Sequence, residues 1–269
     1  MQETDQIIAR NELKEGKEGT FKGLSERLSD GGPRYAETPP KDYPFAQSIV
    51  EPWNATTAFL FVGIAIYWGI RIWPKKRSYP ILITCLPLLL VGGIGGTIYH
   101  ATRSSRVFFL LDVVPIQMIG ILVSIFLWIR LGPTWRTLFS MVGLVALLMS
   151  LRLFPMPLQW SINIAYASLA VLILFPLLYT LKRTHFQYGQ WILFSFVCFI
   201  LAWIFRILDV LDSPVLPMGT HWLWHIFGAL CTSGLGSYFY RLEVSPLFLR
   251  ENLRNVSANT VVLAENKER

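Results

Sequence analysis

The sequence predicts an all-α membrane protein, a bundle of seven transmembrane helices, and three observations lead to that fold class. Of the 269 residues, 53% are apolar and only 15% are charged, whereas a soluble globular protein carries about 25% charged residues. Between Asn54 and Tyr240 the acidic residues are limited to Asp112, Asp209 and Asp212. The apolar residues also form runs long enough to cross a bilayer. Soluble, disordered and disulfide-rich secreted proteins are therefore excluded.

Seven apolar segments divide the middle of the chain. A helix that crosses about 30 Å of hydrocarbon needs about 20 residues, and each segment has between 19 and 24. The fourth segment is the weakest of the seven because Arg136 and Arg152 lie close to its ends. The segments are 55–73, 80–100, 107–130, 134–153, 160–181, 189–209 and 220–240.

Each boundary between segments carries basic or turn-forming residues, which end one helix and precede the next. These boundaries are Pro74–Arg77, Thr102–Arg106, Gly132–Pro133, Pro155–Pro157, Lys182–His185 and Ser213–Pro217. Polar sequence flanks the apolar part on both sides. We expect residues 1–50 to form a partly disordered leader, 51–243 to form the membrane domain, and 244–269 to form a polar cytoplasmic tail.

Basic residues near the segment ends predict the orientation, because they are enriched on the cytoplasmic side of a membrane. Nine of them flank one side: Arg71, Lys75, Lys76, Arg77, Arg130, Arg136, Lys182, Arg183 and Arg241. Three flank the other side: Arg103, Arg106 and Arg152. This places the N-terminus outside or in a lumen and the C-terminus in the cytoplasm. The net charge of +7 is therefore attributed to topology rather than to nucleic-acid binding.

Three histidines are the candidate metal ligands. His221 and His225 are four residues apart, which places them on one face of a helix and lets two imidazoles bind one ion. His100 ends the second segment and His221 begins the seventh, so both are expected at the same outer depth. Three histidines with an open position form the arrangement of catalytic zinc. The alternative is that these histidines are buried and hydrogen-bonded without a metal.

Asp112 is the candidate catalytic residue. It lies about one turn into the third segment, which also starts on the outer side. One hypothesis makes it a fourth ligand of a structural site. Another makes it the carboxylate that orients the attacking water and carries its proton, since zinc lowers the pKa of a bound water to about 7. In a third, it only forms an ion pair with Arg103 or Arg106.

Three stretches of sequence together resemble the alkaline ceramidases. They are Gly93–His100, Leu110–Asp112 and His221–His225. The alkaline ceramidases belong to a superfamily of seven-helix membrane hydrolases that includes the adiponectin receptors. The resemblance extends from about Glu51 to Tyr240, which is the whole membrane domain.

This resemblance implies a zinc-dependent hydrolase that acts on a carbon–nitrogen bond. A ceramide-like membrane lipid would be cleaved at its amide into a sphingoid base and a fatty acid. His100, His221 and His225 would correspond to the zinc ligands, and Asp112 to the carboxylate that holds and deprotonates the attacking water. The protein would be an integral, multi-pass membrane protein.

Two positions depart from the family pattern. The family usually has a serine four residues before the first zinc histidine, where this chain has Gly96. The family also has an acidic calcium site before the first helix. Glu51 matches its last ligand, and Glu37 and Asp42 are the nearest upstream candidates. Calcium takes six to eight oxygens, so the alternative is that Glu51 caps the first helix or binds polar groups at the interface.

Two other functions are alternatives to the hydrolase. Gly96 favours a seven-helix receptor or lipid-binding protein of the same superfamily, with weak or no hydrolysis. A transporter is less consistent with the sequence, which has no pair of broken helices.

Near the end of the sixth segment, Arg206 and Asp209 are expected to form an ion pair. Trp222 and Trp224 are expected to anchor the last helix at the membrane interface.

Overall fold

A computed structural model describes residues 28–39, 49–131, 154–210 and 215–249, and also positions 139, 142, 143, 146 and 150. Within these residues the chain forms helices joined by turns and contains no strand, which confirms the all-α class. The helices are α2 (Pro52–Ala58), α3 (Leu60–Ile72), the 3-10 helix η1 (Trp73–Ser78), α4 (Pro80–Thr102), α5 (Arg106–Leu131), α7 (Leu158–Arg183), α8 (Gly189–Leu208) and α9 (His221–Leu242).

Five helical stretches are long and apolar enough to cross a membrane, which indicates an integral, multi-pass membrane protein. They are Pro52–Ser78, Pro80–Thr102, Arg106–Arg130, Leu158–Arg183 and Gly189–Leu208. Most of the predicted fourth segment, 134–153, lies outside the described residues, as does the tail from position 250. Helix α9 has 22 residues but is less apolar than these five. The seven spans and their orientation therefore stay predictions.

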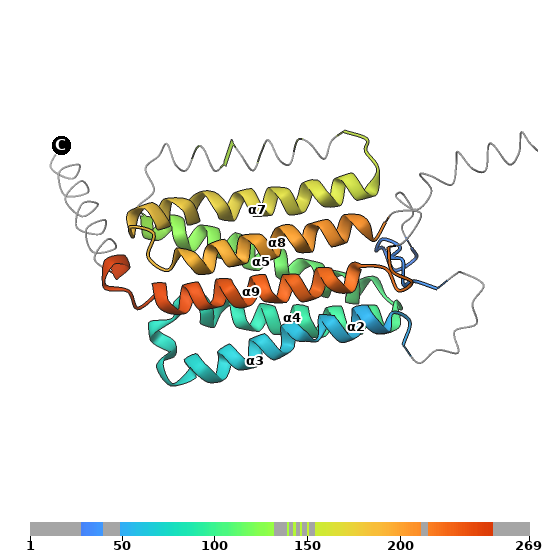
Figure 1. Cartoon of the computed structure of the whole chain (residues 1–269), viewed down its shortest axis with the longest axis horizontal. Coiled ribbons are helices and arrows are strands. Elements are labelled where there is room, and N and C mark those ends of the chain that lie inside the picture. Colours follow the sequence, from blue (N-terminus) through green and yellow to red (C-terminus); the bar gives the residue numbers. More distant parts are fainter. Residues whose placement is uncertain are drawn as a thin grey trace, which may run out of the picture.

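The described helices lie roughly parallel to one another in an elongated bundle (Figure 1). Helix α9 packs along α8, α4 packs along α5, and α2 contacts both α4 and α9. Helix α7 packs on α5. The contacts of α2 with α4 and α9 bring the last turn of α4 close to the first turn of α9, although about 120 residues separate them.

Glycines allow α4 to approach its neighbours closely. A β-carbon at Gly93 would lie 2.8 Å from the backbone nitrogen of Val62 in α3. At Gly95 it would lie 2.5 Å from Cβ of Leu111 in α5. Small residues are a common means of close helix packing in membranes, and here they hold α4 between two helices. The position of His100 at the end of α4 is fixed by this packing.

The two ends of the bundle differ in what they bury. One end contains Glu51, His100, Asp209, His221 and His225, all less than 5% exposed; we refer to it as the histidine end. The opposite end buries an apolar core: Trp68, Ile72, Leu127, Leu181, Tyr238 and Leu242. Figure 1 shows segment 28–39, in blue, lying at the histidine end beside the start of α9.

Candidate metal centre

The structure brings the three predicted histidines together. One ligand nitrogen from each of His100, His221 and His225 lies within 4.8 Å of the other two, close enough to hold a metal ion. Their side chains are 0%, 3% and 4% exposed. The predicted convergence of His100 at the end of α4 with His221 and His225 at the start of α9 is therefore confirmed.

Two of the three rings are oriented by hydrogen bonds. His100 Nδ1 lies 2.6 Å from Glu51 Oε2, and His225 Nδ1 lies 3.0 Å from the carbonyl oxygen of Asn54. Since a carboxylate and a carbonyl only accept, both Nδ1 atoms donate a proton, which leaves each Nε2 free for a ligand bond. Histidines that bind metals are usually held in this way by a carboxylate or a backbone carbonyl.

Two ring nitrogens at the centre have no hydrogen-bond partner in the part of the chain that the structure describes. They are His100 Nε2 and His221 Nδ1, and both are buried. A buried polar atom without a partner is costly, and a metal ion would satisfy it. These orphaned atoms fit a metal site better than the alternative of hydrogen-bonded structural histidines.

Glu51 belongs to a buried network that supports His100. Its other oxygen accepts hydrogen bonds from Thr38 Oγ1 at 2.5 Å and from Arg103 Nη1 at 3.1 Å. Burial would raise the pKa of Glu51, but the hydrogen bond from His100 and the charge of Arg103 outweigh it and hold the pKa below its usual value. Arg103 also donates to both carboxylate oxygens of Asp30, at 2.7 and 3.2 Å.

The predicted calcium ligands have separate partners. Glu37 accepts the backbone N–H groups of Trp53 and Asn54 at 2.6 and 2.9 Å, so it caps the start of α2, and burial raises its pKa. Glu51 precedes α2 but makes no side-chain cap, so the alternative that it caps this helix is wrong. Asp42 lies outside the described residues. Calcium binding at Glu51 stays a prediction, and the guanidinium of Arg103 already contacts that carboxylate.

Segment 28–39 covers the histidines. The ring of Tyr35 stacks on His221 with 3.9 Å between ring centroids and 25° between planes, and Tyr35 is only 8% exposed. The backbone N–H of Ala36 donates to Asp209 at 3.2 Å. This part of the expected leader is therefore ordered against the site, and nothing in its local sequence predicts that contact.

Asp209 positions the first turn of α9. One of its oxygens accepts the N–H groups of Thr220 and His221 at 2.6 and 2.9 Å. Burial raises the pKa of Asp209, and these amide hydrogen bonds oppose that rise. The expected ion pair with Arg206 is wrong, because Asp209 follows the last residue of α8 and turns to the unpaired amides of α9.

Asp112 lines an apolar cavity of about 480 Å³ together with His221 and His225. Its carboxylate lies against Gly96, where a β-carbon would collide with Oδ1. Within the described residues Asp112 makes no ion pair, because Arg103 binds Asp30 and Glu51 instead. Asp112 is also outside the close group of three histidines. The geometry thus agrees best with a carboxylate that faces the cavity.

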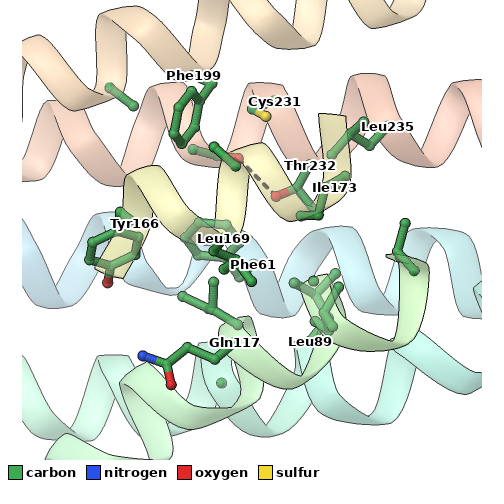
Figure 2. Close-up of a pocket in the computed structure, with 18 of the residues that line it drawn as sticks. Phe61, Leu89, Gln117, Tyr166, Leu169, Ile173, Phe199, Cys231, Thr232 and Leu235 are labelled. Carbon is green, nitrogen blue, oxygen red and sulfur yellow. Dashed lines mark hydrogen bonds between the residues drawn. The ribbon is translucent and has the colours of Figure 1, made fainter. Parts of the chain in front are cut away.

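Side chains from seven helices line this cavity, and Ala58 is the contribution of α2. Figure 2 labels one or more lining residues on each of the other six: Phe61 on α3, Leu89 on α4, Gln117 on α5, Tyr166, Leu169 and Ile173 on α7, Phe199 on α8, and Cys231, Thr232 and Leu235 on α9. Trp224 also lines the cavity, and the role of Trp222 and Trp224 as interfacial anchors stays a prediction. His221 and Phe239 both line it and are eighteen residues apart on α9, which is about 27 Å along a helix.

No family model matches the chain, and a search of curated proteins gives no match either. The resemblance to the alkaline ceramidases therefore rests on the three quoted stretches of sequence.

Proposed function

We propose that the protein is a zinc-dependent intramembrane hydrolase that cleaves the amide bond of a ceramide-like lipid. The observation that carries this proposal is the joint opening of His221, His225 and Asp112 into one apolar cavity. The products would be a sphingoid base and a fatty acid. Volumes of about 300–1,000 Å³ are typical of ligand sites, and the cavity of about 480 Å³ falls in this range.

His100, His221 and His225 would hold the zinc ion, since their nitrogens converge and two are otherwise unpartnered. When bound, zinc supplies a Lewis acid and lowers the pKa of a coordinated water to about 7. Glu51 and the carbonyl of Asn54 keep the rings of His100 and His225 oriented for this task.

Asp112 would act as the general base and then as the general acid. Its carboxylate accepts a proton from the water that attacks the amide carbon and delivers that proton to the leaving nitrogen. The C–N bond breaks, the hydroxyl stays on the acyl carbon, and the nitrogen leaves as an amine. The apolar walls exclude other water and accommodate the acyl chain.

The test combines metal analysis with turnover on one purified sample. We expect about one zinc ion per chain and release of fatty acid from a panel of ceramides. His221→Ala should lose both properties. Asp112→Asn should keep the zinc and lose turnover by about 10²–10⁴-fold, the usual contribution of a general acid–base group.

A lipid-binding or receptor function is the alternative, and Gly96 favours it. Where the family has a serine hydroxyl, this chain has only the carboxylate of Asp112 against the backbone of Gly96. Bound zinc and bound ceramide without any fatty-acid release would support this alternative. Absence of zinc from the purified protein would contradict the metal centre on which both functions depend.

A further inference from the structure

Arg206 is a buried cation that faces the cavity and, in the part of the chain that the structure describes, makes no salt bridge. Its side chain lines the cavity, and the residue is only 5% exposed. Among the described residues its Nε has no hydrogen-bond partner, and its guanidinium makes no salt bridge. A charged group at this depth in a membrane protein is costly and is usually functional.

The buried carboxylates of the histidine end are occupied elsewhere. Asp30 and Glu51 bind Arg103, and Asp209 accepts backbone amides of α9. Glu37 accepts the amides at the start of α2. Asp112 shares the cavity with Arg206, but the proposed function assigns its carboxylate to proton transfer. Arg206 thus has no carboxylate of the described residues in direct contact and can bind one on a ligand.

Two aromatic rings hold the guanidinium in place. Its central carbon lies 4.8 Å from the ring centre of Tyr166 and 5.3 Å from that of Trp224. Cation–π contacts of this kind fix the position of an arginine. Tyr166 also accepts a hydrogen bond from Arg206, whereas Nε has no partner among the described residues. A planar guanidinium with an unpaired Nε donor matches a carboxylate, which an arginine can bind through two parallel hydrogen bonds.

Of the residues that line the cavity, only Asp112 and Arg206 carry a formal charge, apart from the histidines. Arg206 contacts Trp224, the neighbour of His225 in α9, so it lies at the same depth as the metal ligands. The rest of the cavity runs between apolar side chains toward Ile81 and Phe239. An acyl chain would occupy that apolar part, which leaves the amine part of the lipid beside Arg206.

We infer that Arg206 binds a carboxylate on the amine part of a lipid amide, so that N-acyl amino acids are a further class of substrate beside the ceramide-like lipids. This inference rests on the proposed amide hydrolysis and extends its substrate class. Hydrolysis adds water across the C–N bond, which releases a fatty acid from one side and an amino acid from the other. Arg206 takes no proton in this step and serves only to bind and orient the substrate.

The experiment compares two substrates with the same acyl chain, N-palmitoylglycine and N-palmitoylethanolamine, which differ in a carboxylate against a hydroxyl group. We expect kcat/KM to be at least about tenfold higher for the glycine conjugate, because a buried charged group left unpaired disfavours the neutral substrate. Arg206→Gln should remove this preference by slowing the glycine conjugate alone. Arg206→Lys should retain part of it.

Arg183→Gln is the matched control, because Arg183 lies exposed at the far end of α7 from the histidines. It should keep the full preference. Equal kcat/KM for the two substrates in the wild-type protein would overturn the inference and leave the hydrolase intact. An equal loss on both substrates in Arg206→Gln would also overturn it, since that result indicates a structural role.

Direct binding separates this inference from the proposed function. If neither amide is hydrolysed, the hydrolase proposal fails, and calorimetric titration with N-palmitoylglycine then decides the role of Arg206. Binding weakened at least about tenfold by Arg206→Gln would support the carboxylate site, and unchanged binding would overturn it. Arg206-dependent binding of palmitate but not of N-palmitoylglycine would also overturn it, because the carboxylate would then belong to the fatty acid.

Discussion

The histidine end and the opposite end of the bundle are formed by the same helices but bury different kinds of side chain. Helix α9 shows the contrast along its own length. Its first turns carry His221 and His225 among buried polar groups, whereas its last turns carry Tyr238 and Leu242 in an apolar core. One helix can thus hold the candidate metal ligands at one end because its other end supplies the packing.

A buried carboxylate caps a neighbouring helix at each end. Asp209 accepts the first amides of α9, and Glu243 accepts the N–H groups of Ile81 and Leu82 at the start of α4, at 2.8 and 3.4 Å. Asp209 thereby also fixes a metal-ligand candidate, His221. Glu243 fixes only the packing of α4. A carboxylate cap therefore positions a candidate metal ligand at one end of the bundle and only stabilises the packing at the other.

The largest effect is expected from a substitution that removes a metal ligand from the histidine end and leaves the opposite end unchanged. His225→Ala removes a ligand from the candidate centre and should abolish stoichiometric zinc binding, because two histidines bind a metal far more weakly than three. Elemental analysis of the purified protein measures the effect, and helical circular dichroism serves as the control for folding. Full zinc content in this variant would show that the three histidines do not form the site.

A substitution in the opposite half of α9 should lower the stability of the protein and leave its zinc content unchanged. Leu242 is fully buried, and Leu242→Ala should lower the free energy of unfolding by about 2–5 kcal/mol through the cavity it leaves. Unfolding by denaturant in detergent measures this loss. The zinc content should remain at the wild-type value, and its loss would show that the two ends are not independent.

A smaller effect is expected from the charge that supports His100. Arg103→Gln leaves Glu51 and Asp30 without their cation, so Glu51 no longer holds His100 as firmly. Changes to groups that orient metal ligands typically reduce metal affinity by about 10–100-fold. Competition with a chelator measures the affinity, and Arg106→Gln is the control, because Arg106 is exposed nearby. Equal affinities in the two variants would contradict the supporting role.

The smallest effect concerns the pH dependence of stability. Burial raises the pKa of Glu243 to about 7 despite the opposing amide hydrogen bonds, against 4.5 for an ordinary glutamate. The folded protein therefore binds this proton more tightly than the unfolded chain. The stabilisation is complete below about pH 4.5 and is lost as the pH rises through about 7.

Glu243→Gln should remove this part of the pH dependence. Between pH 5 and pH 8 the wild-type Tm should fall more than the Tm of the variant, as measured by differential scanning fluorimetry. Parallel changes in Tm for the two proteins would show that Glu243 does not bind a proton on folding in this range.

The sequence predicts best what depends on segment order and local spacing. The i, i+4 spacing of His221 and His225 and the alternating direction of the apolar segments were sufficient to predict that His100 lies beside this pair. Contacts that depend on loops could not be predicted in this way. Tyr35 on His221 and Glu51 on His100 join residues 186 and 49 positions apart, and no local pattern encodes them.

The error at Arg206 and Asp209 has a physical cause. A spacing of three residues on a helix allows such a pair, and Asp209, the C-cap of α8, still has helical backbone angles. Its carboxylate instead accepts the N–H groups of Ala36, Thr220 and His221, which belong to other segments of the chain. Arg206 is left facing the cavity, which became visible only with the packing of α7 and α9 around it.

At position 103, the stability of the helix end favours glycine, whereas the candidate metal centre requires the arginine. This residue ends α4 in the left-handed region, with φ of 46°, where glycine is the favoured residue. Arg103→Gly would relieve the backbone and improve the helix end, yet it would release Asp30 and Glu51 together. A screen for thermostable variants could therefore select an inactive protein at this position, and it should measure bound metal as well as melting temperature.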